Sequence, residues 1–428
     1  MSYTNNVSGS NVFSVPDNTG IGNLNGFFKD TWESQLNVLI PDGVKILNKI
    51  SFMPKEKMPG NLFHCPVVLG LEHGVTFGSE TDDYMSLNSP IAGSIKDATV
   101  RGAPMILRSI LGYTAASRAA QGGQAAFMDA TKFLVANMLR SITKKLEIEM
   151  LYGKMGYGVV DAAGLVGSDV VIKTSEWASG IWAGAENLEV DFFTGNTLSG
   201  QAVISAVDLA ARKLTLTASG IGLAGILAGD VIFPKGYKSG ATLKSFLGVH
   251  AIMKETSSLY NIDCTKTSLF KGNIYDASGA ALSFTKLNLA AARAVEKGLE
   301  GALWVLVNPR TWANLMNDQA ALRKYDASYS SEKVELGSKA IKFYSQNGEL
   351  EIEPSIYVKE GYAYMLSIAD FSRIGSTDVT FKRPGQGDQF FRDMENASGY
   401  ELRCFSDQAL FCSAPGRSVL IENIVNAN

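Results

Sequence analysis

Residues Gln124 to Tyr152 read QAAFMDATKFLVANMLRSITKKLEIEMLY and contain neither Gly nor Pro, while Gly122, Gly123 and Gly153 bound them. The absence of helix breakers predicts one continuous α-helix, with Gly153 placed as a left-handed C-cap residue. At 1.5 Å per residue this helix would be roughly 44 Å long, far beyond the usual length. We therefore expect a structural spine around which the rest of the chain is arranged.

One face of this helix is predicted to be buried. Its apolar side chains recur at steps of three, four or seven residues, at Met128, Val135, Leu139, Ile142, Leu146 and Met150. An Asp in place of Leu139 is therefore expected to block folding or assembly. Glu147 and Glu149 point to different faces of a helix, so we interpret them as solvated or interface charges rather than as a catalytic pair.

The composition indicates a large protein with more apolar surface than one core requires. The chain has 428 residues, enough for two or three domains, and a net charge of -3, which does not favour a nucleic-acid-binding surface. Charged residues make up 19% and the mean hydropathy is +0.05, yet no apolar run approaches the ~20 residues of a membrane span. We expect the surplus to be buried between subunits of an obligate assembly; a large monomer is the alternative.

Two features bear on the compartment. The first 26 residues are polar and rich in Asn, Ser and Gly, with no secretory signal, so we expect something outside the chain's own core to hold them. Cys65, Cys264, Cys404 and Cys412 form no CxxC pair or dense framework, which predicts reduced thiols in a cytoplasmic setting.

The segments before the spine are predicted to be an arm, at 27–58, and a long exposed hairpin between Leu62 and Ser117. Gly and Pro interrupt every apolar run of the hairpin, so little core is expected there. The residues we expect at contacts between subunits are Phe27, Phe28, Trp32, Tyr84, Lys96 and Arg101.

After the spine, short β-prone segments from Gly156 to about Gly248 predict a small inserted barrel or sandwich. Helix and strand patterns then alternate. We expect a helix capped by Thr285 and ending at Gly298, a buried strand ALWVLV, and a helix that Asn308 caps and Pro309 begins. The remaining expected elements are a hairpin turning at Asn347-Gly348, the strands SIYVKEG and YAYML, an alternating strand GYELRCF and a last strand after Pro415.

Gly220 to Gly225 (GIGLAG) has the spacing of a dinucleotide-binding fingerprint. That fingerprint works only where a helix begins at the glycines, and here the strand-like VIF follows within a few residues. A glycine-rich hairpin is the preferred interpretation; a nucleotide-dependent oxidoreductase is the alternative.

No other sequence pattern indicates a catalytic, metal-binding or phosphate-binding site. His64, Cys65 and His73 lack metal-site spacing, and Cys404 and Cys412 are expected to be buried small side chains. The motifs GxSxG and GxxxxGK[ST] are absent. We therefore expect no catalytic residue, no cofactor and no metal ion.

The order of these parts resembles the major capsid proteins of tailed double-stranded DNA bacteriophages, the Hong Kong 97 type. The likeness extends over nearly the whole chain and is carried by Leu151–Gly158 (LYGKMGYG), Ala228–Met253, Tyr260–Asn273, Val307–Trp312 (VNPRTW) and ELRCFSDQALF with the Pro415-Gly416 turn. No single motif is diagnostic.

The resemblance implies an α+β subunit with a long spine helix, an extended β-hairpin loop, an N-terminal arm and an inserted small β-barrel domain. Carried over, the divisions are an arm at 1–60, the extended loop with flanking strands at 61–120, the spine helix of a peripheral domain at 121–157, the insertion at 158–243, an axial domain at 244–353 and a return to the peripheral domain at 354–428. The extended loop itself would run from about Leu71 to Ser117.

The same resemblance implies a non-enzymatic shell protein that forms hexamers and pentamers of an icosahedral capsid around packaged DNA, which it contacts without sequence preference. Its expected partners are copies of itself, a separate scaffolding protein, a portal and a decoration protein, with no membrane. Its expected location is the virion, after assembly in the host cytoplasm. Alternatives are a nanocompartment shell of the same fold and a glycan-binding protein based on residues 158–243.

Overall fold

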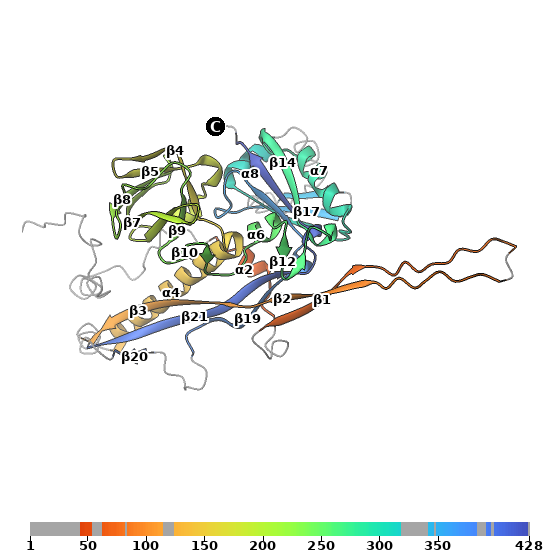
Figure 1. Ribbon diagram of the computed structural model, residues 1–428. Helices are drawn as coiled ribbons and strands as arrows, with labels where there is room; N and C mark the ends of the chain where they lie inside the picture. Colours follow the sequence, from red (N-terminus) through yellow and green to blue (C-terminus); the bar gives the residue numbers. More distant parts are fainter. Residues whose placement is uncertain are drawn as a thin grey trace, which may run out of the picture.

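The computed structural model describes residues 43–53, 62–81, 84–113, 124–317, 341–345, 348–382, 391–394 and 398–426, with the backbone only at 124–133 and 341–345. The body contains a long helix on a twisted sheet, a barrel at one end, a second sheet with helices at the other, and a projecting hairpin (Figure 1). Phe27, Phe28 and Trp32 lie outside the described residues.

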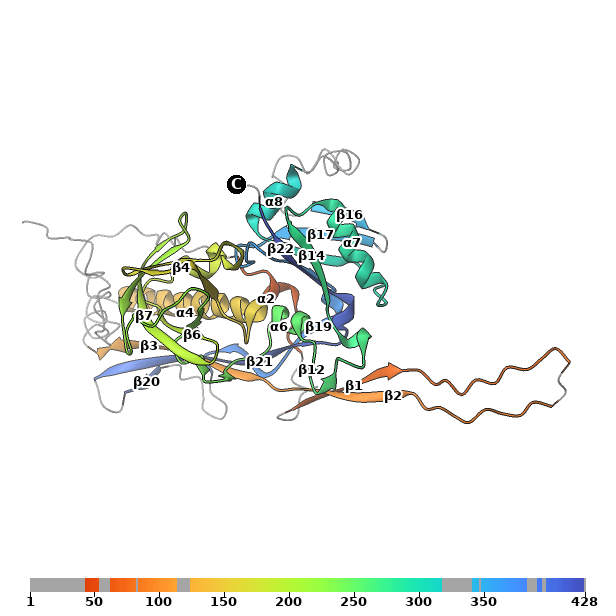
Figure 2. The ribbon, with the colours of Figure 1, turned by 45° about the horizontal axis from the view of Figure 1, so that its top comes forward.

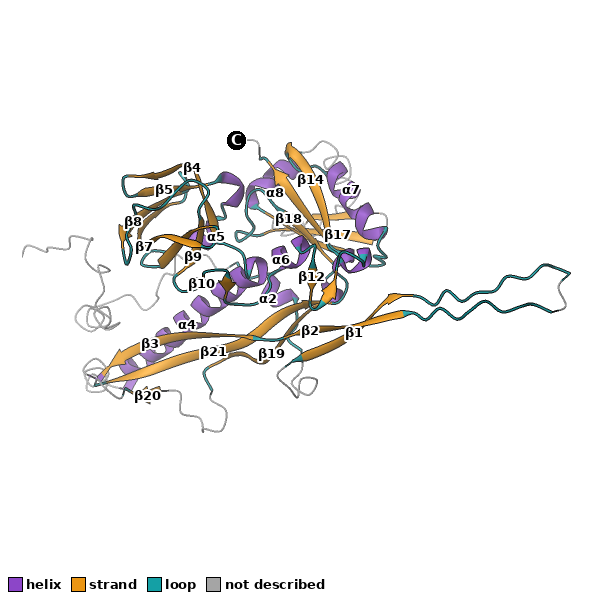
Figure 3. Ribbon diagram, viewed as in Figure 1, coloured by secondary structure: helices purple, strands orange, loops and turns teal. Residues whose placement is uncertain are grey.

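The spine is α4, a single helix from Gln124 to Tyr152, as predicted. It lies over a sheet in which β21 pairs on one side with β3 and on the other with β19 and β20 (Figures 1 and 3). Met138, Ile142 and Leu146 of the helix pack on Leu402 and Cys404 of β21. The strands of this sheet are β3 (Ala103–Gly112), β19 (Phe371–Thr380), β20 (Phe391–Asp393) and β21 (Gly399–Cys412).

The predicted buried stripe of the spine is wrong at Leu139, and the side chain of Met128 lies outside the described residues. Ile142, Leu146 and Met150 are fully buried, but the side chain of Leu139 is 38% exposed and Met138 is buried in its place. Both lie within one turn of Ile142, so the helical period permits either of them on the buried face. The apolar side chains of β21 determine which of Met138 and Leu139 is buried, and the helix sequence alone does not show where these side chains lie.

A six-stranded sheet forms the opposite end of the body, in the order β14-β22-β18-β15-β17-β16. The predicted strand ALWVLV is β15, and all five of its residues are buried because it lies inside the sheet between β18 and β17. The strands are β14 (Asn273–Ala280), β15 (Leu303–Val307), β16 (Ile341–Ser345), β17 (Gly348–Pro354), β18 (Ala363–Leu366) and β22 (Val419–Ile424).

Two helices accompany this sheet: α7 (Phe284–Val295) and α8 (Pro309–Met316). Asn308 caps α8, because its side chain accepts the backbone N–H of Arg310 at 2.9 Å, as predicted. The cap of α7 is Ser283, which accepts the N–H of Lys286 at 3.3 Å, and not Thr285. Residues 355–361, predicted as a strand, form turns instead.

The inserted module is a closed barrel with the strand order β4-β5-β8-β7-β6-β9. It confirms the barrel predicted after the spine. Gly220–Gly225 lies in the connection from β8 to β9, Gly222 has a φ of +84°, and no helix begins there, so the segment lacks the geometry of a dinucleotide site. The strands are β4 (Gly158–Val166), β5 (Asp169–Ile172), β6 (Glu189–Thr194), β7 (Thr197–Asp208), β8 (Lys213–Ala218) and β9 (Val231–Pro234).

Short elements connect these units. They are α2 (Ile46–Lys49), α5 (Ser179–Trp182), α6 (Val249–Lys254), β10 (Lys238–Ser239), β11 (Thr242–Leu243), β12 (Ser258–Leu259) and β13 (Ile262–Asp263). Among the helices that the structure describes, none combines the length and hydropathy that a membrane span needs.

The extended hairpin is built by β1 (Phe63–Gly70) and β2 (Ser94–Val100), which pair antiparallel. Figure 2 shows the connecting segment continuing outward, away from the barrel and the spine. The expected loop from Leu71 to Ser117 is too long at its second end, because Ala103–Gly112 is strand β3 of the sheet under the spine.

Candidate assembly surface and the polar junctions behind it

The hairpin carries the largest exposed apolar side chains of the described chain. Phe77 is 89% and Tyr84 is 98% exposed. Further exposed apolar residues lie on the same projection: Val68, Leu71, Val75, Met85, Leu87, Ile91 and Ile95. Exposed apolar residues gathered in this way mark an interaction surface rather than a folding core.

Among the described residues of the hairpin, the backbone is only partly paired. The β1–β2 ladder ends at Gly70 and Ser94, and beyond it the N–H of His73 donates to the carbonyl of Ile91 at 3.2 Å. Farther out, Asn88 donates its side-chain amide to the carbonyl of Val75 and its backbone N–H to the hydroxyl of Thr76, both at 2.9 Å. The hairpin therefore has extended chain available for pairing with another molecule.

The three predicted contact residues that the structure describes, Tyr84, Lys96 and Arg101, do not form one cluster. Tyr84 lies at the far end of the hairpin, Lys96 lies on β2 opposite Val67, and Arg101 lies between β2 and β3; all three are exposed. Near the base, Nδ1 of His64 lies 2.5 Å from Oδ2 of Asp97. Within the described ranges, no group of three His, Cys, Asp or Glu side chains forms a metal site.

The expectation for Glu147 and Glu149 is wrong, because both side chains are buried, at 0% and 2% exposure. Glu147 accepts the backbone N–H groups of Lys45, Ile46 and Leu47 at 2.9, 2.9 and 3.0 Å. Burial raises the pKa of this carboxyl, and the three backbone hydrogen bonds oppose the rise. Glu147 therefore ties the segment before β1 to the spine.

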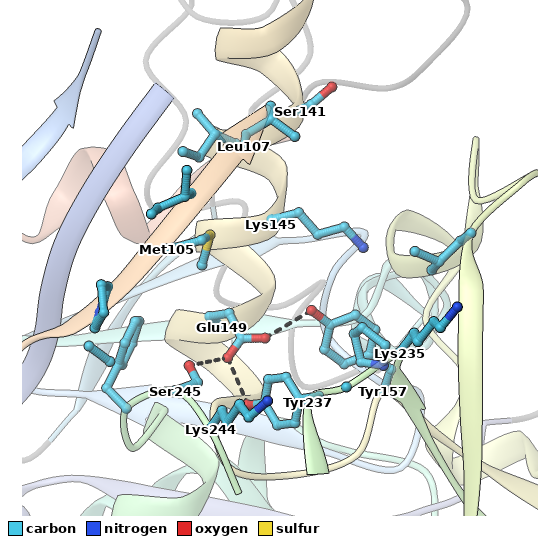
Figure 4. A pocket seen from close by; sticks show the side chains of 18 residues that line it. Met105, Leu107, Ser141, Lys145, Glu149, Tyr157, Lys235, Tyr237, Lys244 and Ser245 are labelled. Carbon is cyan, nitrogen blue, oxygen red and sulfur yellow. Dashed lines mark hydrogen bonds between the residues drawn. The ribbon is translucent and has the colours of Figure 1, made fainter. Parts of the chain in front are cut away.

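Glu149 connects the barrel to the spine. Its two oxygens accept the hydroxyls of Tyr157 at 2.8 Å, Tyr237 at 2.8 Å and Ser245 at 2.5 Å (Figure 4). Burial raises its pKa, and the three hydroxyl donors oppose the rise. Tyr157 precedes the first barrel strand and the other two follow the last, so one carboxylate fastens both ends of the insertion to the spine.

A cavity of about 550 Å³ lies beside Glu149, between α4, β3 and the barrel. Figure 4 shows Lys145 extending from α4 into this cavity, and its ammonium lies 5.2 Å from the centre of the Tyr157 ring. Burial and the charge of Lys144 lower the pKa of Lys145 to about 8. The apolar wall includes Met105 and Leu107 of β3.

A second buried network joins the spine, the barrel and the six-stranded sheet. The ammonium of Lys359 donates to Glu176 at 2.7 Å and to the carbonyl of Gly156 at 2.9 Å, and its backbone N–H donates to the hydroxyl of Tyr152. Burial raises the pKa of Glu176, but the charge of Lys359 and hydrogen bonds from Lys359 and Tyr362 outweigh it and bring the pKa to about 2.

His250 belongs to the same network. Its Nδ1 lies 2.9 Å from the hydroxyl of Tyr364. Burial and the charges of Lys359 and Lys254 lower the pKa of His250 to about 3, so the imidazole is neutral in the folded protein at physiological pH.

These buried groups support structure rather than reaction. Each of the carboxylates at 147, 149 and 176 is already saturated by donors from neighbouring elements. Burial raises the pKa of Cys404 to about 11 and raises that of Cys412 above its usual range, which makes both thiols poor nucleophiles. Sequence reasoning missed the junctions because their partners lie as far as 207 residues away along the chain.

The arrangement of parts defines the fold: a spine helix on a long sheet, a second sheet with helices, an inserted barrel and a projecting hairpin. It is an α+β fold of the Hong Kong 97 capsid type, which confirms the fold predicted from the sequence. The capsid asymmetric unit of cyanophage A-1(L) aligns with 92% of this chain and 97% of its own, with a TM-score of 0.50 at 10% identity.

Two further solved structures align over most of the chain. The capsid of a native GTA particle covers 94% of this chain and 97% of its own, with a TM-score of 0.49 at 8% identity. A structure of Mycobacterium phage Adephagia aligns with 95% of this chain and 98% of its own, with a TM-score of 0.45 at 10% identity. No family model matches the sequence, and no curated protein matches it.

Proposed function

We propose that this chain is the major capsid protein of a tailed double-stranded DNA bacteriophage, a non-enzymatic subunit that assembles into hexamers and pentamers of an icosahedral shell. The observation that carries the proposal is the projecting hairpin, whose apolar side chains are left uncovered by the described parts of their own chain. The fold shared with the cyanophage capsid structure supports it.

Physical reasoning favours a repeated assembly. A hairpin with Phe77 at 89% and Tyr84 at 98% exposure costs solubility unless another molecule covers it. Copies of the same chain supply identical surfaces at a fixed geometry, and closed symmetry lets every copy be covered in the same way. Contacts that are modest singly sum to a stable lattice once the ring is closed.

The body of the subunit suits this role. Buried hydrogen bonds of Glu147, Glu149 and Glu176 connect the spine to the segment before β1, the barrel and the six-stranded sheet. These connections would hold the parts of a subunit in fixed positions within a shell. Further parts of the proposal are a separate scaffolding protein, a portal, a decoration protein, non-specific contact with packaged DNA, assembly in the host cytoplasm and residence in the virion.

Expression of the full chain, alone and with candidate scaffolding proteins, tests the proposal. Electron microscopy should reveal closed shells of uniform diameter, and native particles should contain DNA. A chain that stays a soluble monomer at micromolar concentration under every condition contradicts it. Particles filled with an enzyme instead of DNA would favour the nanocompartment alternative.

A further inference from the structure

The cavity beside Glu149 has the size and the lining of a small-molecule site. Its volume is about 550 Å³. Ligand sites in proteins commonly measure about 300–1,000 Å³ and are mostly apolar, with a few polar groups that orient the ligand. Three parts of the subunit build the cavity: α4, one face of β3, and the base of the barrel with the segment that follows it. A molecule bound in the cavity would therefore contact all three.

The greater part of the lining is apolar. Met105 and Leu107 extend from β3 toward α4 (Figure 4), and both are half-buried, because alternate residues of the strand face this side. The apolar wall of the cavity consists of Met105, Leu107, Ile142, Leu188, Pro234 and Phe246. Each methylene group that moves from water onto such a wall raises the affinity of a ligand by roughly fourfold.

One ammonium group extends into the cavity from the spine. Lys145 lies one helical turn before Glu149 on α4, and Figure 4 shows its side chain in the cavity. Its ammonium lies 5.2 Å from the centre of the Tyr157 ring, and among the described residues no carboxylate forms an ion pair with it. A partly buried cation without a counter-charge favours an anionic ligand.

The other charged groups of the lining do not supply that counter-charge. The two oxygens of Glu149 accept three hydroxyl donors. Lys235 pairs with Glu189, outside the lining. The charged and titratable groups near Lys145 are Lys144 and Glu149 on α4, Tyr157, Lys235 and Tyr237 at the base of the barrel, and Lys244. Lysines outnumber carboxylates among them, so the lining attracts an anion.

The charge of Lys145 depends on pH within an accessible range. Burial and the charge of Lys144 lower its pKa to about 8, although Glu149 opposes this change. The ammonium is therefore the main form at pH 7 and is lost as the pH rises above 8. A carboxylate ligand stays ionised over the whole of this range.

We propose that the cavity between α4, β3 and the barrel binds a fatty acid, with the carboxylate on the ammonium of Lys145 and the alkyl chain along the apolar wall. The ligand would join the spine, the long sheet and the barrel at one point. This site goes beyond the proposed shell function and does not depend on it, because it lies within a single subunit.

Calorimetric titration of the unassembled full chain with decanoate, below its micellar concentration, tests the site. We expect saturable binding of one decanoate per chain at pH 7. Lys145→Met should weaken it by about ten- to a hundredfold, because the carboxylate loses a charge-assisted hydrogen bond. Lys145→Arg, which keeps the charge, should retain most of the affinity. Lys266→Met is the matched control, since Lys266 is 82% exposed and does not line the cavity.

Two further ligands separate the roles of the head group and the chain. Decan-1-ol, which lacks the charge, should bind the unaltered chain and Lys145→Met with equal affinity. Butyrate, which keeps the carboxylate and loses six methylene groups, should bind at least a hundredfold more weakly than decanoate. Raising the pH from 7 to 9.5 should weaken the binding of decanoate to the unaltered chain and leave its binding to Lys145→Met unchanged.

The remaining outcomes contradict the proposal. Equal affinity of the unaltered chain and Lys145→Met for decanoate, or the same loss in Lys266→Met, would show non-specific adsorption to apolar surface. Equal affinity for butyrate and decanoate would show that the apolar wall takes no part. Absence of decanoate binding in a chain that forms closed shells overturns the site alone, whereas binding in a chain that never assembles keeps the site and removes the shell function.

Discussion

The carboxylate of Glu147 accepts the backbone N–H of Ile46 at 2.9 Å, across 101 residues of sequence. Because Lys45 and Leu47 donate to the same carboxylate, one side chain of the spine holds the whole first turn of α2. The position of the segment that precedes the hairpin is thereby coupled to the spine on which the barrel is fastened.

Replacing Glu147 by Ala should destabilise the subunit by about 2–4 kcal/mol, because three buried N–H groups lose a charged acceptor. Chemical denaturation of the unassembled chain measures this change. Glu300→Ala is the matched control, since Glu300 is exposed, and it should change the free energy of unfolding by less than about 0.5 kcal/mol. Equal effects of the two substitutions would show that the carboxylate at 147 does not hold α2.

The spine sequence predicts the helix but not every buried position on it. Ile142→Asp should prevent folding, because the side chain is 1% exposed and would bring an unpaired charge into the core between α4 and β21. Leu139→Asp, one turn away and 38% exposed, should leave the far-ultraviolet circular dichroism spectrum and the solubility unchanged. If Leu139→Asp abolishes folding as well, the burial described for this face is wrong.

Local patterns account for the elements that were predicted correctly. The strand Leu303–Val307 is apolar throughout, and the helix that follows begins with Asn308-Pro309, so both signals lie within a few residues. The long spine likewise follows from a run without breakers. The order of these elements along the chain was sufficient to identify the fold.

Errors arose where a distant segment determines the environment. Glu149 has the sequence neighbourhood of a surface residue, but Tyr157 and the distant residues Tyr237 and Ser245 donate hydroxyls that make its burial tolerable. Residues 355–361 have the composition of a strand but form turns, and the ammonium of Lys359 within them donates to Glu176, 183 residues away. Tyr237, Ser245 and Glu176 lie 88 to 183 residues from the side chains they contact, so a short stretch of sequence does not reveal them.

Acid should weaken the subunit through His250. The pKa of this imidazole is lowered from 6.5 to about 3, so between these values the unfolded chain binds a proton that the folded chain does not. The contribution of the neutral His250 side chain to the free energy of unfolding is therefore fully present above about pH 6.5. It falls as the pH drops toward 3, by up to about 1.4 kcal/mol per pH unit. Denaturation midpoints of the unassembled chain between pH 5 and pH 8 measure the slope.

His250→Gln should flatten that slope, whereas His73→Gln should leave it unchanged, because His73 lies exposed on the hairpin. Glu176 adds a separate loss at lower pH, since its carboxyl has a pKa near 2 in the folded chain against 4.5 ordinarily and must be protonated there. A slope of equal size in the His250→Gln variant would assign the acid sensitivity of this range to other groups.

Tyr84→Ser and Phe77→Ser should separate folding from assembly. Both side chains are almost fully exposed in the single chain, so their removal should leave the unfolding midpoint of the unassembled subunit within about 0.5 kcal/mol of the original. In a shell the same side chains would be buried against a neighbouring copy, and truncating an aromatic anchor at an interface typically costs about 2 kcal/mol or more.

Sedimentation velocity should therefore detect free subunits where the unaltered chain gives shells. Leu289→Ser, which removes an apolar side chain that is 55% exposed on α7, should still assemble. Normal shells from the double hairpin variant would show that the exposed aromatics of the hairpin are not what joins one subunit to the next.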